Sequence, residues 1–256
     1  MGTLKEKLEY IAETKDAIKD AIEAKGVTVA STATFRSYAD SIEEIEISTD
    51  IIPIQMFTDN NTTTSTYTIN LEAGYYLFSI IKASANEESY TITISGNNSL
   101  LYSYQNDLIY QIDEASTVTI VYTPWNQFPS VDKLVCIFKI EGYTNFTAYY
   151  QDELYDGGIT YDLANLANGD YIIIAQGNSV YNTGYDRAKV EYPYSDGSNS
   201  GIQYLGEKDL RYWKSSNRFK ALRVILYHAA SNQYRSSIYA YGQAAGYGVI
   251  QAIAVS

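Results

Sequence analysis

The sequence predicts a mainly β protein that begins with a small α-helical module. Apolar residues recur at helical spacing within residues 4–47. From about residue 50 onward the chain is rich in Tyr, Thr and Asn, and apolar and polar residues alternate in short runs. Short strands in succession, without helices between them, are typical of β-sandwiches and jelly rolls. We therefore expect a helix–turn–helix connector over residues 1–48 and two β-sandwich or jelly-roll-like domains over residues 50–141 and 143–256.

The first predicted helix has clear start and stop signals. Thr3 and Glu6 have the spacing of a capping box, in which the hydroxyl and the carboxylate each accept a hydrogen bond from a free backbone N–H. Gly26 follows Lys25 and favours termination, because glycine adopts the left-handed conformation without strain and a cation suits the C-terminal end of the helix dipole.

Apolar residues recur every seven positions along this helix, in two rows that form a seam like that of a coiled coil. Lys15 occupies a place in the second row where an apolar residue is expected. A polar residue in such a seam weakens the contact but can fix register and strand number. The seam consists of Leu4, Leu8, Ile11, Ile18 and Ile22.

A second, shorter helix is expected after Thr34, which we interpret as its N-cap. Its apolar residues share one face and are Phe35, Tyr38, Ile42 and Ile45. A module of this size rarely holds a core without help. We therefore favour self-association or docking onto a larger assembly; the alternative is a helical hairpin that closes on itself.

These residues also carry a resemblance to a known family. Residues 17–27 read AIKDAIEAKGV and residues 34–45 read TFRSYADSIEEI. The pattern, a helix ending A-I-x-x-K-G-V followed by T-F-x-x-Y-x-x-x-I-x-x-I, resembles a module of bacteriophage tail, baseplate and fibre proteins. One departure is the spacer at residues 29–33, which lacks the proline and glycine that this module often has.

The resemblance implies a non-enzymatic structural protein of the virion, made in the cytoplasm of a host bacterium. We expect a fibre, spike or decoration component whose N-terminal helices anchor it and whose β domains project. The expected partners are further copies of the chain, with a trimer favoured, and other virion proteins. A host-surface glycan is an additional candidate partner.

Composition excludes several other classes of function. The net charge of −12 argues against binding to duplex nucleic acid or to an anionic membrane surface. No signal peptide is visible, and no apolar run approaches the length of a membrane-spanning helix, so membrane insertion is not expected. The single cysteine, Cys136, excludes an intrachain disulfide and is interpreted as an inert core residue.

Tyrosine is the most unusual feature of the composition, with 27 residues against 7 phenylalanines and 2 tryptophans. Tyrosine buries a ring and still presents a hydroxyl, so it suits strand faces and wet interfaces. We interpret most of these residues as sheet residues; a recognition surface of stacked tyrosines is the alternative.

The β region contains a faint internal repeat. Leu71-x-x-Gly74-x-Tyr76 matches Leu166-x-x-Gly169-x-Tyr171, and each copy follows a run of alternating residues. The repeat raises the hypothesis of a domain duplication; the alternative is one continuous β domain. Elsewhere residues 134–140 predict a buried central strand, and residues 242–248 predict a glycine turn between two C-terminal strands.

No residue set predicts catalysis. The one histidine, His228, is interpreted as a partly buried, hydrogen-bonded residue. Asp152, Glu153 and Asp156 could serve a two-carboxylate glycosidase or ligate calcium, but a polar turn is the favoured interpretation. We expect no catalytic residues, no cofactor and no metal site, and a polysaccharide-degrading enzyme ranks last among the functions considered.

The most cationic and aromatic run is the candidate for ligand binding. Arg211, Tyr212 and Trp213 adjoin the turn at residues 195–201, and aromatic rings can stack on sugar faces. We interpret the run as a ligand-facing loop of a carbohydrate- or host-surface-binding module, with a solvated loop as the alternative.

Overall fold

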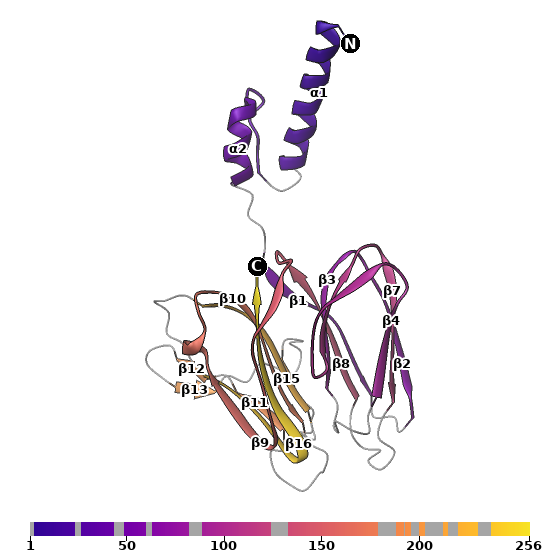
Figure 1. The fold of residues 1–256 in the computed structure, drawn as a ribbon, viewed down its shortest axis with the longest axis vertical. Coiled ribbons are helices and arrows are strands. Elements are labelled where there is room, and N and C mark those ends of the chain that lie inside the picture. The colour runs from indigo at the N-terminus through magenta and orange to yellow at the C-terminus, as the bar shows by residue number, and fades with distance from the viewer. Residues whose placement is uncertain are drawn as a thin grey trace. The chain divides into compact units, whose positions relative to one another are not determined.

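The computed structural model describes residues 3–23, 27–43, 49–59, 63–81, 89–123, 133–178, 188–191, 193–195, 200–202, 212–214, 220–229 and 237–256. The chain divides into two compact units, residues 1–48 and residues 49–256. The described part of the first unit is helical and that of the second consists mostly of strands, as Figure 1 shows. The predicted fold class, mainly β with a small helical module, is confirmed.

The helical unit consists of α1 (Leu4–Glu23) and α2 (Phe35–Glu43). The predicted capping box starts α1, because Glu6 accepts a hydrogen bond from the Thr3 backbone N–H at 2.6 Å and Thr3 Oγ1 accepts one from the Glu6 N–H at 3.3 Å. Thr34 caps α2 as predicted, with its Oγ1 accepting from the Ser37 N–H at 3.4 Å. The predicted stop at Gly26 lies outside the described residues.

A small core joins the two helices. Ile22, Val29 and Tyr38 are buried together, with Ile18 packed against them. The Tyr38 hydroxyl donates a hydrogen bond to the Lys15 backbone carbonyl, 3.4 Å away. The contact between the helices therefore lies at the C-terminal half of α1.

The described residues of the first half of the β unit form eight strands in two antiparallel sheets. The five-stranded sheet has the order β1-β8-β3-β6-β5, and the three-stranded sheet has the order β2-β7-β4. The strands are β1 (Asp50–Asp59), β2 (Ser65–Leu71), β3 (Gly74–Ile81), β4 (Ser89–Ile94), β5 (Asn98–Tyr104), β6 (Asp107–Ile112), β7 (Ser116–Thr123) and β8 (Lys133–Glu141).

The second half repeats this connectivity with longer strands. Its main sheet contains the order β16-β10-β15-β14, and β9 and β11 both pair with β16. The elements are β9 (Phe146–Asp162), η1 (Leu163–Asn165), β10 (Gly169–Asn178), β11 (Ala188–Glu191), β12 (Pro193–Ser195), β13 (Ser200–Ile202), β14 (Tyr212–Lys214), β15 (Lys220–Ala229) and β16 (Ser237–Val255).

Both halves have the strand pairing of a jelly roll. A jelly roll winds eight strands so that the first pairs with the last, the second with the seventh and the third with the sixth. The pairs β1·β8, β2·β7 and β3·β6 follow this rule. The fourth and fifth strands depart from the pattern, because β4 pairs with β7 and β5 pairs with β6. In the second half β9 takes the places of the first two strands and β16 the places of the last two, while β10 pairs with β15. The order β9-β16-β10-β15-β14 thus reproduces β1-β8-β3-β6-β5.

Three apolar layers hold the β unit together. One fills the first jelly roll and includes Phe78 and Ile137; a second fills the second jelly roll and includes Ile173. The third lies between the main sheets of the two halves and includes Phe138 and Ile172. Residues 137 and 138, or 172 and 173, point to opposite faces because side chains alternate along a strand. The main sheets are therefore apolar on both faces.

The sequence repeat marks the same local structure in both halves. The Tyr76 hydroxyl donates to the Glu72 carbonyl at 3.0 Å, and the Tyr171 hydroxyl donates to the Ala167 carbonyl at 3.2 Å. Gly74 and Gly169 precede them with φ of +153° and +148°. Such backbone strongly favours glycine. Shared topology and a shared corner together support duplication of one jelly roll.

The two jelly rolls occupy the ranges predicted for the two β domains, but they lie in one compact unit and share the middle apolar layer. The predicted boundary near residue 142 falls between β8 and β9. That each half forms a domain able to fold alone stays a prediction.

Two predicted turns are wrong. Residues 152–158 and 242–248 each lie within a continuous strand, β9 and β16. The glycines there accommodate an irregularity rather than a chain reversal, because the β16–β9 register shifts between Gly242 and Tyr247. Cys136 is buried on β8, a strand with neighbours on both sides, as predicted.

Candidate interaction surface and polar sites

The predicted seam of α1 is split into a covered and a bare part. Ile18 and Ile22 belong to the small core shared with α2. Leu4, Leu8 and Ile11 are 75%, 58% and 49% exposed. At 3.6 residues per turn, the side chains of all five residues point to within about 40° of one direction around the helix axis, so they share one face of α1. The first turns of α1 therefore present an apolar stripe that no described part of the chain covers.

The apolar face predicted for α2 is covered at one position. Tyr38 is buried, whereas Phe35 and Ile42 are 48% and 51% exposed. The rings of Phe35 and Tyr38 meet edge to face, with centroids 5.9 Å apart. Ile45 lies outside the described residues. Together, Leu4, Leu8, Ile11, Phe35 and Ile42 place five large exposed apolar side chains on the helical unit.

The predicted ligand-facing loop is in part a strand. Residues 212–214 form β14, which pairs with β15 so that Trp213 lies opposite Leu222. β14 ends the strand order of its sheet. Arg211 lies outside the described residues. A ligand-facing role of Tyr212 and Trp213 stays a prediction, now placed on a sheet edge instead of a loop.

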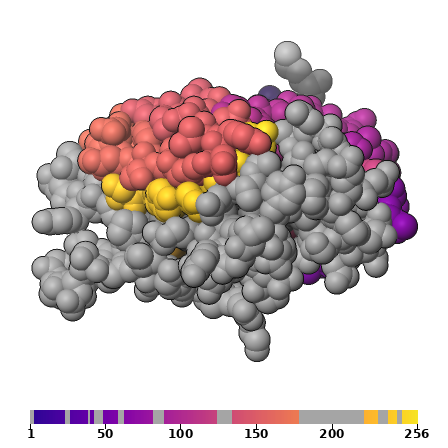
Figure 2. All heavy atoms as spheres, turned by 90° about the horizontal axis from the view of Figure 1, so that it is seen from below, coloured from indigo at the N-terminus to yellow at the C-terminus, as the bar shows by residue number. Residues whose placement is uncertain are grey.

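The acidic cluster does not form a site with converging carboxylates. Asp152 and Glu153 are exposed neighbours on β9, so their side chains point to opposite faces of the sheet. Asp152 accepts a hydrogen bond from the Tyr150 hydroxyl at 3.1 Å, and Glu153 accepts one from Gln105 at 2.5 Å. Figure 2 shows β9 spread over one face of the molecule, with β16 beside it. Within the described part of the chain, no group of three or more His, Cys, Asp or Glu could hold a metal ion.

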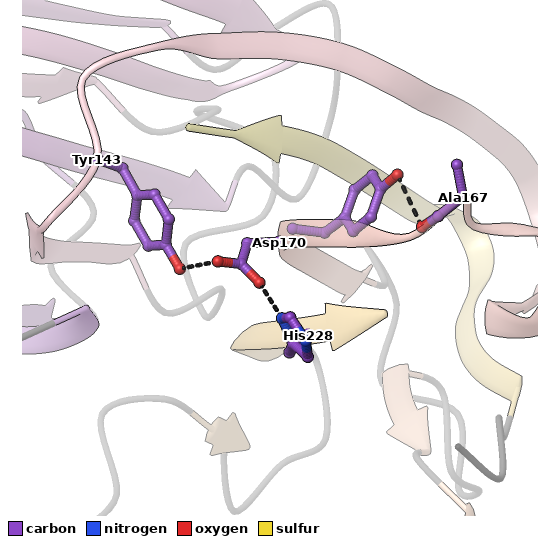
Figure 3. A network of polar contacts seen from close by, with 5 residues as sticks. Tyr143, Ala167, Asp170 and His228 are labelled. Carbon is purple, nitrogen blue, oxygen red and sulfur yellow. Dashed lines mark hydrogen bonds and ion pairs between the residues drawn. The ribbon is translucent and has the colours of Figure 1, made fainter. Parts of the chain in front are cut away.

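His228 belongs to a polar group at the boundary between the halves. Its Nδ1 contacts Asp170 Oδ1, and the Tyr143 hydroxyl donates to Asp170 Oδ2 at 2.7 Å (Figure 3). Burial raises the pKa of Asp170, but the hydrogen bonds from His228 and Tyr143 outweigh it, so its pKa is lowered. The side chain of His228 is 67% exposed. The predicted hydrogen bonding is correct and the predicted partial burial is wrong.

This group offers no nucleophile aligned on the histidine. Asp170 lies at the start of β10 and His228 near the end of β15, in directly paired positions. The Tyr143 hydroxyl is bound to the other oxygen of the same carboxylate, so it is not activated by the imidazole. The arrangement joins the segment between β8 and β9 to the second main sheet.

Sequence reasoning missed two acids that the structure makes prominent. Asp170 is one, and Asp107, fully buried between the two main sheets, is the other. Their partners lie 27 to 144 residues away along the chain. No local periodicity signals contacts at such separations.

Comparison with known proteins identifies no family. No family model and no curated protein matches the chain. Among solved structures, the chain is similar to the major capsid protein P2 of bacteriophage PM2, with 10% identity, a TM-score of 0.27, and coverage of 82% of this chain and 98% of that one. A similarity this weak decides neither fold nor function. None of the described helices has the length and apolar character needed to cross a membrane.

Proposed function

We propose that the protein is a non-enzymatic structural component of a bacteriophage virion. Residues 1–48 anchor and assemble it, and the β unit projects as a fibre, spike or decoration. The proposal is supported by the resemblance of residues 17–45 to a phage module and by the paired jelly rolls, an architecture found in viral capsid and lectin domains.

The bare stripe of Leu4, Leu8 and Ile11 carries the proposal. Full burial of a leucine or isoleucine side chain stabilises by about 1.5–3 kcal/mol. Three such side chains exposed on one helix face favour association with another apolar surface. A helix that only closed on its own hairpin would need no such stripe beyond the contact with α2.

The residues of the seam bear on how many copies it would join. The spacing places Leu4, Ile11 and Ile18 in one row, and Leu8, Lys15 and Ile22 in the other. Isoleucine in both rows shifts preference from dimers to trimers or tetramers, but of the isoleucines only Ile11 lies in the free part of the seam. We favour a homotrimer. Because α2 covers Ile18 and Ile22, the free seam is short, and we expect other virion proteins to complete the contact.

The test is whether the chain is part of the particle. Phage particles from the bacterium that carries this gene would be purified on a density gradient, washed in high salt and analysed by mass spectrometry. We expect peptides of this chain in the particle fraction at a fixed ratio to the coat protein. Recovery only with free soluble protein would contradict the proposal.

A second candidate function is binding of a host-surface glycan. The position of Tyr212 and Trp213 on β14 supports it, since β14 ends its sheet among the described strands. Trp213→Ala should then weaken binding to host cells or to their isolated polysaccharide severalfold and leave the unfolding midpoint unchanged. Unchanged binding would reject this placement of the site.

A further inference from the structure

A buried carboxylate lies between the two jelly rolls. Asp107, at the start of β6, is 0% exposed, and so are Ser79 on β3 and Gln251 on β16; Gln176 on β10 is 3% exposed. These four side chains meet in the apolar layer between the main sheets, among Leu77, Ile109, Cys136 and Ile174. We call the four residues the Asp107 cluster.

Both halves of the β unit supply hydrogen bonds to this carboxylate. Ser79 Oγ donates to Oδ1 at 2.5 Å, and Gln176 Nε2 lies 2.7 Å from both Oδ1 and Oδ2. Gln251 Nε2 contacts Oδ2 and holds its own Oε1 2.8 Å from the Tyr102 hydroxyl. Two of the donors to Asp107 therefore belong to the second half, while Asp107 belongs to the first.

All the donors are uncharged, and none of the described residues forms an ion pair with Asp107. Tyr102 and Cys136 are the titratable groups that share its layer. The charge of Asp107 also acts on Tyr90, which packs in the core inside the first jelly roll. Burial raises the pKa of each, and the charge of Asp107 raises it further, so they stay neutral below about pH 8. A negative charge on Asp107 is thus buried in an apolar layer with no counter-ion among the described residues, which is costly.

We propose that the Asp107 cluster is a proton-sensitive latch between the two jelly rolls. When Asp107 is protonated, the halves are held together by the full apolar layer and a neutral polar cluster. When Asp107 is ionised, separating the halves lets water solvate the carboxylate, so opening costs less. The cluster also fixes how the sheets stack, because both amides must reach one carboxylate.

The direction of the pH effect follows from the two states. Burial raises the pKa of Asp107 to about 7, although the hydrogen bonds from Ser79, Gln251 and Gln176 lower it. A solvated aspartate has a pKa of about 3.9. The latch is therefore strongest below about pH 4 and weakens as the pH rises towards 7. The opening equilibrium constant should rise roughly 50-fold between pH 5 and pH 7 and about twofold more by pH 8.

The single cysteine reports on this opening. Cys136 lies in the same layer as Asp107 and is 0% exposed, so its thiol reacts only when the layer opens. The full chain would be labelled with 4,4′-dithiodipyridine from pH 5 to pH 8, and each rate divided by that of the urea-unfolded chain at the same pH. We expect the normalised rate to rise roughly 50-fold between pH 5 and pH 7 in the native protein.

Two variants test the role of Asp107. The side chain introduced by Asp107→Asn cannot ionise, so the normalised labelling rate of Cys136 should be independent of pH in this variant. The control is Asp113→Asn, which changes an exposed acid just beyond β6 and should leave the pH dependence of the labelling rate as in the native chain. Equal pH dependence in native and Asp107→Asn protein overturns the proposal. If Asp107→Asn does not fold, Ser79→Ala replaces it. Loss of that donor should raise the pKa of Asp107 in the closed state and so extend the rise to higher pH. A rise that levels off at the same pH as in the native protein overturns the proposal equally.

A thiol on the opposite face of β8 shows where the opening occurs. Val135 neighbours Cys136 and belongs to the core inside the first jelly roll. In a chain carrying Val135→Cys with Cys136→Ala, the thiol should react at least tenfold more slowly than Cys136 at pH 7. Equal rates would mean that the whole unit unfolds together, and the latch between the halves would be rejected.

Discussion

Asp107 of the first jelly roll lies 2.7 Å from the side-chain amide of Gln176 of the second, and both side chains are buried. The same layer holds Phe138 and Ile172, which also come from different halves. The two halves therefore share a core, and their stabilities depend on each other.

The shared core predicts one unfolding transition. Phe138→Ala removes a fully buried ring from it and should lower the free energy of unfolding by about 3–5 kcal/mol. Trp125 and Trp213 belong to the first and second halves of the sequence, so Trp125→Phe and Trp213→Phe give single-tryptophan proteins that report each half. In urea both fluorescence midpoints should coincide and both should fall with Phe138→Ala. Separate midpoints would mean that the halves unfold independently.

The repeated corner predicts equal losses in both halves. Tyr76→Phe and Tyr171→Phe each remove the hydroxyl that donates to a carbonyl four residues earlier. Each should lower the free energy of unfolding by about 0.5–1.5 kcal/mol in urea titrations. Tyr75→Phe is the matched control, because its hydroxyl has no hydrogen bond in the described structure. A loss from Tyr75→Phe as large as the other two would show that the corner bonds contribute nothing specific.

The polar group around Asp170 predicts a pH dependence opposite to that of Asp107. Its pKa is lowered in the folded chain, so the stability it contributes is present above about pH 4 and is lost as the pH falls further. Tyr143→Phe should cost about 0.5–1.5 kcal/mol of unfolding free energy at pH 7 and clearly less at pH 3.

The control for this experiment is a tyrosine whose acceptor does not titrate. The Tyr149 hydroxyl donates to the Asn165 backbone carbonyl at 3.2 Å. The cost of Tyr149→Phe should therefore be the same at pH 7 and pH 3. If the cost of Tyr143→Phe were equally constant, the hydrogen bond to Asp170 would not depend on its charge.

Local features of this fold could be predicted from the sequence. The capping box of Thr3 and Glu6 and the cap at Thr34 depend on residues three positions apart, and both are present. The corner at Gly74 and Gly169 was visible as a repeat because each copy is contained within a few residues.

Features that depend on tertiary contacts could not be predicted in this way. The glycines at 157–158 and 242–248 have the composition of turns, but pairing along the whole length of β9 and β16 keeps the strands continuous. The burial of Asp107 depends on Gln176 and Gln251, 69 and 144 residues away. Only the stacking of the two main sheets brings these residues together.

We propose that the exposed stripe of Leu4, Leu8 and Ile11 on α1 assembles the protein. The solution mass of the full chain would be measured by light scattering at tens of micromolar. The test variant carries Leu4→Gln, Leu8→Gln and Ile11→Gln, since glutamine keeps the helix propensity of leucine. The control variant carries Ile54→Gln, Leu100→Gln and Leu154→Gln, which change three exposed apolar residues of the β unit. We predict a trimer for the native chain and the control, and dissociation of the test variant. A monomeric native chain, or a test variant that keeps the native mass, would contradict the claim.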